Sequence, residues 1–225
     1  MRVRAQFPLQ LHRMNTPEIF RPKDDAEIDR LVAAYPLALV ISAARGQVQA
    51  SPLPLVLQRR ASGEATLIGH FSRFNRQLEL VREEPRALIA FSGAQGYISS
   101  SWLRERKYAP TWNYEAVHFE VEITLEDEPG AAQRALEILL QQVDAPYPNP
   151  WRLEEMGARF EKLAAAIVPF RARVLGTQAQ FKLGQGDPQD LLDDALGALQ
   201  RYGQTNLANA MRRIHASDAG GTTAI

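Results

Sequence analysis

Apolar and polar residues alternate without a break between residues 117 and 126. The apolar positions are Val117, Phe119, Val121, Ile123 and Leu125, and the polar positions are His118, Glu120, Glu122, Thr124 and Glu126. Successive side chains of a strand point to opposite faces, so a period of two predicts a half-buried β-strand. One face should meet the core and the other should meet water or a partner.

Residues 24–36 have a helical period instead. Asp24 and Glu27, three residues later, resemble a capping box, which marks the start of a helix. Apolar residues then recur at i, i+3, i+4 and i+7, at positions Ile28, Leu31, Val32 and Tyr35. This pattern predicts an amphipathic helix that ends at Pro36.

The next segment favours strands. An apolar run at 37–43 is followed by the turn signal Arg45-Gly46 and by an extended stretch at 47–58. Pro52 and Pro54 lie within that stretch and cannot donate hydrogen bonds to a neighbouring strand. The stretch is therefore expected at a sheet edge or to carry a bulge.

The rest of the chain mixes short strands and helices. Further strands are expected at 65–70 and 86–91, and helices at 75–84, 131–143, 151–164, 188–202 and 205–214. Alternating stretches at 168–174 and 179–183 flank Gly176-Thr177 and predict a hairpin there. Because the strands mostly lack crossover helices, we expect an α+β fold with an antiparallel sheet or barrel and with peripheral and C-terminal helices.

The chain boundaries suggest one domain with two extensions. Met14-Asn15-Thr16-Pro17 has the form of a second start, so residues 1–13 are predicted to be a flexible N-terminal extension. Residues 14–215 are expected to form a single domain. The small residues of 216–225 predict a disordered tail.

Composition narrows the possible functions. The 225 residues include no cysteine, which excludes disulfides, thiolate metal sites and a cysteine nucleophile. The four histidines lack the short spacing of a zinc motif. Acidic and basic residues balance at 26 each, which lowers the expectation of direct DNA binding. Without an apolar membrane segment or a secretory signal, a cytoplasmic protein is expected.

Residues 69–77 combine groups that suit a phosphate. They lie between an expected strand and an expected helix, whose N-terminus exposes free backbone N–H groups. Ser72 adds a hydroxyl, Asn75 an amide, and Arg73 and Arg76 add planar cationic forks. The alternative is a helix N-cap followed by solvated arginines. His70 lies in the same segment and titrates near neutral pH in its ordinary state.

A second cluster is rich in aromatic and hydroxyl residues. It contains Tyr97, Ser99 and Trp102, and then Thr111, Trp112 and Asn113. Aromatic rings could pack on a flat heterocycle while the polar groups fix its edge. The alternative is a core aromatic belt with capping serines. A Gly-x-Ser-x-Gly elbow is missing, which disfavours serine hydrolase chemistry.

Four motifs together resemble the PaiB family of FMN-binding negative transcriptional regulators. They are Gly-His-Phe-Ser-Arg-Phe-Asn at 69–75, Tyr-Ile-Ser-Ser-Ser-Trp at 97–102, Pro-Thr-Trp-Asn-Tyr at 110–114 with Val117-His118, and Lys-Leu-Gly-Gln at 182–185. The start at Met14 is also similar to that family's start. The resemblance covers about residues 14–200.

The resemblance implies a fold, a cofactor and a set of site residues. The fold is the FMN-binding split β-barrel, similar to pyridoxamine phosphate oxidase, which forms a homodimer with each flavin in a groove between subunits. Ser72, Arg73 and Asn75 occupy the turn that holds the FMN phosphate in such chains. Lys182 and Gln185 join the implied cofactor site, together with His70 and the six residues of the aromatic cluster. The family usually continues with Asn and a basic residue, where this chain has Gly186-Asp187.

Two functions stay open from the sequence. The first is a flavin-binding transcriptional regulator, and the second is an FMN-dependent oxidoreductase acting on a small molecule, because FMN supplies redox chemistry in many proteins. A haem-binding split barrel with His70 or His118 as ligand is a minor third alternative. The C-terminal helices could form a helix-turn-helix with Arg212 and Arg213 facing DNA, but packing of their apolar residues is the simpler interpretation.

Overall fold

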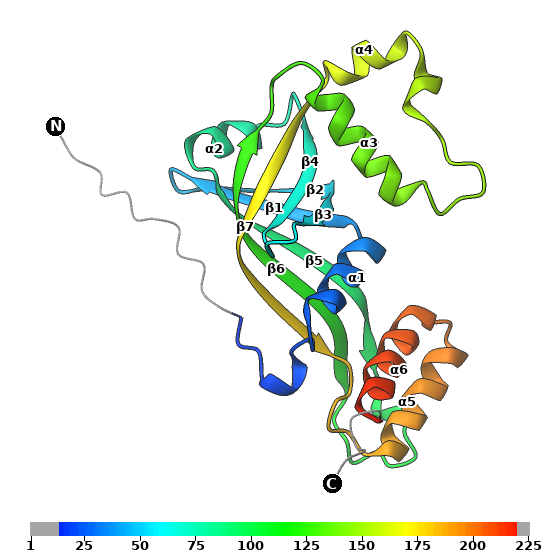
Figure 1. Ribbon diagram of the computed structural model, residues 1–225. Coiled ribbons are helices and arrows are strands. Elements are labelled where there is room, and N and C mark those ends of the chain that lie inside the picture. Colours follow the sequence, from blue (N-terminus) through cyan, green and yellow to red (C-terminus); the bar gives the residue numbers. More distant parts are fainter. Residues whose placement is uncertain (1–13, 220–225) are drawn as a thin grey trace, which may run out of the picture. The chain divides into compact units, whose positions relative to one another are not determined.

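The computed structural model describes residues 14–219 (Figure 1). The predicted extension at 1–13 lies outside the described residues, and so does 220–225 of the predicted tail. The last helix runs to Ala219 and therefore includes the first residues of the segment expected to be a tail.

The helices and strands follow in mixed order along the chain. The strands are β1 Leu37–Ala44, β2 Gln47–Pro54, β3 Val56–Arg59, β4 Ala65–Ser72, β5 Arg86–Ile98, β6 Thr111–Leu125 and β7 Ile167–Lys182. The α-helices are α1 Asp25–Ala34, α2 Gln77–Glu83, α3 Ala131–Val143, α4 Arg159–Ala164, α5 Gln189–Arg201 and α6 Thr205–Ala219. Within residues 14–219 there are also three short 3-10 helices, η1 Glu18–Phe20, η2 Ser100–Trp102 and η3 Leu153–Met156.

The described residues group into two compact units. The first unit contains Val32–Phe91 and His118–Gln178, and the second contains Met14–Leu31, Ser92–Val117 and the chain from Ala179 onward. The strands β5, β6 and β7 each contribute one part to each unit. The prediction that 14–215 is a single domain stays a prediction.

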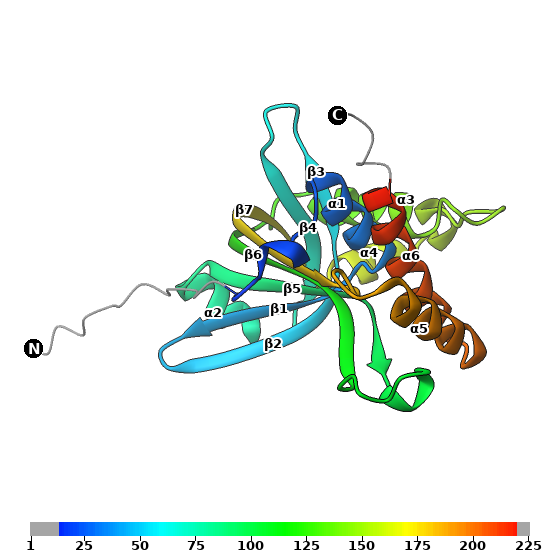
Figure 2. The same ribbon diagram turned by 90° about the horizontal axis from the view of Figure 1, so that it is seen from below.

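The first unit is built on a seven-stranded sheet with the order β2-β1-β5-β6-β7-β4-β3. The sheet is not closed, because β2 and β3 are its two edges. Antiparallel pairs include β1–β2, with Leu39 opposite Pro52 and Leu37 opposite Pro54 (Figure 2). The predicted edge position of the proline-containing stretch is confirmed, since neither proline needs to donate a bond on its outer side.

The core of the first unit lies on one face of this sheet. Phe71 and Phe170 have ring centroids 4.9 Å apart, and Phe91 meets Phe119 edge to face at 5.8 Å. The alternation that predicted a half-buried strand at 117–126 is confirmed, because Phe119 and Val121 are fully buried, whereas Glu120 and Glu122 are not.

Two predictions about local structure were wrong. The expected hairpin at Gly176-Thr177 does not exist, because β7 is one strand of 16 residues. Its middle is half-buried on both faces, so the apolar alternation changes phase there without a turn. The expected helix at 151–164 is instead η3 and α4, separated at Gly157, whose positive φ of 54° interrupts a helix.

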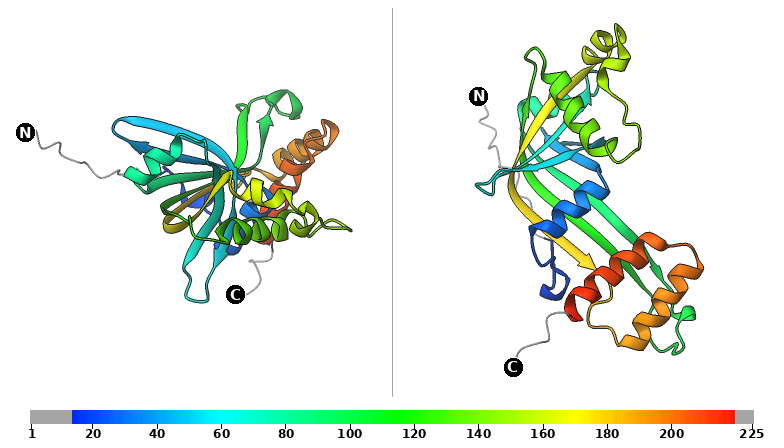
Figure 3. Two further views of the ribbon diagram at one scale, coloured as in Figure 1. Left: turned by 90° about the horizontal axis from the view of Figure 1, so that it is seen from above. Right: turned by 45° about the vertical axis from the view of Figure 1, so that its right-hand side comes forward.

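The second unit combines the ends of three strands with helices. α5 and α6 lie side by side and are joined at Gly203, which has a φ of 70° (Figure 3). The inward side chains of α6 are at most 5% exposed: Leu207, Ala208, Ala210, Met211 and Ile214. Packing, rather than an exposed recognition face, is therefore the role of this side of the helix.

Candidate functional site

The predicted phosphate turn is in the first unit, between the end of β4 and the start of α2. Asn75 is the residue that organises it. Its Oδ1 accepts from the backbone N–H of Gln77 at 2.9 Å and from Nε2 of Gln49 at 3.1 Å, while its Nδ2 donates to Oγ of Ser51 at 2.8 Å. The Asn75 amide thus bonds the first N–H of α2, while the N-cap residue itself, Arg76, makes no side-chain cap bond. Ser72 is exposed, and its Oγ accepts from the N–H of Phe74 at 3.4 Å.

The two arginines of this turn differ in how they are engaged. Nε of Arg73 donates to the carbonyl of Ala165 at 2.8 Å, and Nη2 donates to that of Ile167 at 3.0 Å. Nη1 lies 3.8 Å from the Asp127 carboxylate. Arg76 is exposed, and its guanidinium has no hydrogen bond or ion pair with any described residue, although its backbone carbonyl accepts from the N–H of Glu79 at 3.1 Å. Arg76 is therefore the cation of this turn that can turn toward an anion without breaking existing contacts.

A buried amide below the turn was not anticipated from the sequence. Gln77 is 0% exposed, and its Nε2 donates to the carbonyl of Val40 at 2.8 Å and to Oγ of Ser42 at 2.9 Å. These bonds fix α2 on β1, so the turn before α2 has a rigid base. The sequence feature that could have predicted this contact is Ser42, a polar residue at a core-facing position of the strand at 37–43.

His70 and His118 are both half-buried in the first unit. Removal from water disfavours the charged imidazolium, so burial lowers the pKa of His70 and of His118 below 6.5. Burial therefore favours the neutral form of both rings, in which each can donate one hydrogen bond and accept another.

The second unit contains a cleft of about 270 Å³. Its walls are mostly apolar and come from η1, the end of β5, the segment between η2 and β6, α5 and α6; they include Phe20, Ile98, Leu103, Tyr108, Leu191, Ala195 and Met211. Its polar lining consists of Thr111, Asn113, Lys182, Gln185 and Asp187. Four of the twelve site residues predicted from the sequence thus meet in one cleft, although they come from two strands and a turn.

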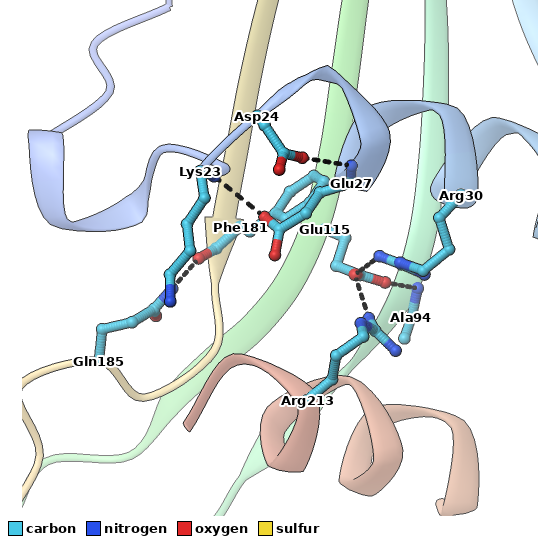
Figure 4. Close-up of polar contacts among 9 residues, drawn as sticks. All are labelled: Lys23, Asp24, Glu27, Arg30, Ala94, Glu115, Phe181, Gln185 and Arg213. Atoms are coloured by element: carbon cyan, nitrogen blue, oxygen red, sulfur yellow. Dashed lines mark hydrogen bonds and ion pairs between the residues drawn. The ribbon is translucent and has the colours of Figure 1, made fainter. Parts of the chain in front are cut away.

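The polar groups of the cleft are held in place by neighbours. Nζ of Lys182 donates to Oγ1 of Thr111. Asn113 is 2% exposed, and its Nδ2 approaches Sδ of Met211 at 3.7 Å. Gln185 is used by its own turn, because its Oε1 accepts from the N–H of Leu183 at 2.7 Å and its Nε2 donates to the carbonyl of Phe181 at 2.6 Å (Figure 4).

Asp187 stands at the rim of the same cleft. Partial burial raises the pKa of the Asp187 carboxyl, and the positive charges of His215 and Lys182 act in the opposite direction. The backbone N–H of Asp187 donates to the carbonyl of Gly184 at 3.1 Å. Gly184 and Gly186 have φ values of 87° and 82°, a conformation that favours glycine.

The aromatic residues form a row outside the cleft. Tyr97 lies 6.4 Å from Trp102 and 6.1 Å from Trp112, and Trp102 lies 5.2 Å from Tyr202, between ring centroids. Tyr97 and Trp112 are 42% and 51% exposed, so the rings do not form a core belt. Ser99 caps η2 by accepting from the N–H of Ser101, as the alternative interpretation expected.

An ion triad within the second unit was missed by sequence reasoning. Glu115 is 0% exposed, and its Oε1 accepts from Nη2 of Arg30 at 2.5 Å and from Nη2 of Arg213 at 2.8 Å (Figure 4). Its Oε2 accepts from the N–H of Ala94 at 3.2 Å. The available signal was an acidic residue in the inward phase of β6, two positions before Val117.

Comparison with known proteins agrees with these features. Residues 14–175 match the family described as "Putative FMN-binding domain". The chain is 30% identical over 173 residues to "Protease synthase and sporulation protein PAI 2" of Bacillus subtilis (strain 168), which covers 76% of this chain and 82% of that protein.

Two solved structures have a similar fold. The flavocytochrome Anf3 from Azotobacter vinelandii has a TM-score of 0.58 and 16% identity, with 76% of this chain and 74% of that chain covered. The FAD and heme binding protein from Mycobacterium smegmatis has a TM-score of 0.56 and 19% identity, with 79% and 78% covered. At these identities the likeness concerns the fold alone. None of the helices described in residues 14–219 is long and apolar enough to span a membrane.

Proposed function

Since the chain belongs to the PaiB family of FMN-binding split-barrel proteins, we propose that it is a flavin-binding regulatory protein that controls transcription. The support from sequence is the Bacillus relative, which is named a protease synthase and sporulation protein and 82% of whose length is covered. The FMN-dependent oxidoreductase is the alternative that the test below separates from it.

FMN is the cofactor that this family membership assigns to the chain, and each unit, taken by itself, has groups that suit a part of it. The first unit offers an exposed hydroxyl and an exposed arginine at the 72–76 turn, which suit a phosphate. The second unit offers a cleft with apolar walls and a polar end, which suits a flat ring. When bound, FMN would supply reversible electron acceptance. His70, Tyr97, Ser99, Trp102 and Trp112 stay predicted cofactor residues.

The regulatory proposal rests on the observation that two helices and the ends of two strands line the same cleft. Leu191 and Ala195 come from α5, and Met211 comes from α6, while Thr111 and Lys182 come from strands. A ligand in the cleft would touch both helices and the strand ends at the same time. Occupancy would therefore stabilise one position of the α5–α6 pair, and a ligand can only shift an equilibrium through such differential contacts.

Hydrogen exchange can test this coupling. With FMN bound, amide exchange in α5 and α6 should slow, because their local opening would require loss of the ligand. The same FMN-loaded protein should not sustain repeated oxidation of NADH or NADPH with oxygen or a quinone as acceptor. Unchanged exchange in both helices would refute the regulatory proposal, and turnover near the usual enzymatic range of about 1 per second or more would favour the oxidoreductase.

Transcription itself requires a cellular test. Deletion of the gene in its source organism should raise a defined set of transcripts, and the wild-type gene should restore them. A Lys182→Met variant that has lost flavin should fail to restore them. Equal restoration by the variant would show that flavin occupancy does not control the response.

We also propose a homodimer, formed through the outer apolar face of the first unit. This face carries the odd-numbered side chains of β1 and their partners on β2 and β5: Leu37, Leu39, Ile41, Ala43, Val48, Ala50, Pro52, Pro54, Leu88 and Ala90. Leu37, Leu39 and Val48 are 63%, 46% and 72% exposed. A contiguous apolar face on an edge of a sheet is what a second copy would cover.

Light scattering tests the dimer. Wild-type protein should have twice the chain mass at micromolar concentration, and Leu39→Glu should shift it to the monomer by placing charge in the interface. Leu163→Glu is the matched control, because Leu163 is similarly exposed at 41% but lies on α4. A monomeric wild type, or a dimer that Leu39→Glu leaves intact, would contradict this interface.

A further inference from the structure

The polar end of the second-unit cleft carries balanced charge. It has one cation, Lys182, and one carboxylate, Asp187, with the buried amide of Asn113 beside them. The Thr111 oxygen accepts from the Lys182 ammonium, and its O–H can still donate. Any group bound here would thus meet donors and an acceptor together, not a purely cationic surface.

This balance disfavours a phosphate. A phosphate ester carries close to two negative charges and would lie near the Asp187 carboxylate, where like charges repel. The start of α5 borders the cleft, but Pro188 before it has no N–H, and the N–H groups of Leu183 and Asp187 are donated within the turn around Gly184. The phosphate of FMN therefore requires a different place in the molecule.

The edge of a flavin ring fits the same groups. Its pyrimidine edge presents two carbonyl oxygens on either side of one N–H, so it requires two donors flanking one acceptor. Lys182 and Asn113 supply donors, and Asp187 supplies the acceptor. The apolar walls suit the rest of the ring, and about 270 Å³ is below the roughly 300–1,000 Å³ typical of sites for whole ligands.

We propose that the cleft binds the pyrimidine edge of the flavin ring, with Asp187 as the acceptor for the ring N3–H. The proposal rests on the proposed FMN binding and adds the orientation of the ring and a specificity residue. It also gives a role to Asp187, at the place where the family usually has other residues. Two glycines with positive φ fix the turn that presents this carboxylate, so its position is set before a ligand arrives.

The test uses ring analogues that lack phosphate. Wild-type protein should bind lumiflavin, which has neither ribityl chain nor phosphate, and should bind 3-methyllumiflavin roughly tenfold to a hundredfold more weakly, because the methyl group removes the N3–H donor. Asp187→Leu should bind the two analogues about equally. Asp190→Leu is the matched control, since Asp190 is exposed at the start of α5 and does not line the cleft; it should discriminate as the wild type does.

A second variant separates ring recognition from phosphate recognition. Lys182→Met should weaken lumiflavin and FMN by similar factors, measured by flavin fluorescence titration. A much larger loss for FMN than for lumiflavin would overturn the inference, because the phosphate would then bind in the cleft. If wild type and Asp187→Leu discriminate equally against 3-methyllumiflavin, the assigned role of Asp187 is overturned, and the proposed FMN binding is unaffected. Failure of the wild type to bind any flavin would instead refute the FMN function itself.

Discussion

Replacing Glu115 with Gln should destabilise the protein far more than an ordinary surface substitution. The Glu115 carboxylate is fully buried and compensates two guanidiniums. In Glu115→Gln one amide oxygen can still accept from the arginines, but the amide NH₂ then replaces the oxygen that accepts from Ala94 N–H. Two donors would face each other there, and two positive charges would lose their counter-charge.

The magnitude follows from burial. Removing one partner of a buried ion pair costs about 3–5 kcal/mol because the remaining charge is uncompensated. The side chains of Arg30 and Arg213 are 30% and 34% exposed, so water screens part of their charge. We therefore expect about 3 kcal/mol, the lower end of that range. For a chain of this size, that loss corresponds to a fall in Tm of roughly 6–12 °C.

The assay is calorimetry or urea unfolding at pH 7 with a control on the same strand. Glu122 pairs with Arg173 in an exposed position, with side chains 42% and 62% exposed. Glu122→Gln should cost only about 0–1 kcal/mol. A loss for Glu115→Gln that does not exceed the loss for Glu122→Gln would refute the view that the triad holds the second unit together.

Two further predictions concern the turn and the histidines of the first unit. In fluorescence titration, Arg76→Ala should weaken FMN binding roughly tenfold to a hundredfold and leave riboflavin binding unchanged. Arg73→Ala should weaken the binding of both ligands alike, because Arg73 holds the segment at the start of β7 through two carbonyls. The reverse pattern would make Arg73 the phosphate ligand. Burial lowers the pKa of His70 and of His118 below 6.5, so below that pH the unfolded chain binds protons that the folded chain does not, and stability falls as the pH drops toward the folded-state pKa. Urea unfolding should therefore give lower stability at pH 5.5 than at pH 7.5, and a smaller difference when both histidines are replaced by Gln; an unchanged difference would rule out their contribution.

Local patterns predicted most of the fold because they report directly on burial. The alternation at 117–126 identified part of β6, and the helical period before Pro36 identified α1. The prolines at 52 and 54 placed β2 at an edge. The prediction of a hairpin at Gly176-Thr177 was wrong because a change of phase in the apolar pattern can have two causes. One is a turn, and the other is a single strand whose buried face changes along its length, as in β7.

The site was predicted less completely, because contacts between distant segments leave no local period. The motifs pointed to Thr111, Asn113, Lys182 and Gln185, and the structure brings these four into one cleft. Motifs could not say that Gln185 is used by its own turn or that Arg73 is bound to two carbonyls. Glu115 carried the clearest overlooked signal, since a charged residue at an inward strand position requires a partner.

The inward face of β6 joins the cleft to the buried triad. Thr111, Asn113 and Glu115 are successive residues on that face, since side chains two apart in a strand point the same way. α6 contacts two of them, through Met211 beside Asn113 and through Arg213 at Glu115. A ligand that displaces Met211 would therefore act on α6, whose neighbouring contact with β6 is the ion pair between Arg213 and the buried Glu115. Because that charge tolerates little movement, α6 should respond to occupancy as a rigid element and not by local fraying.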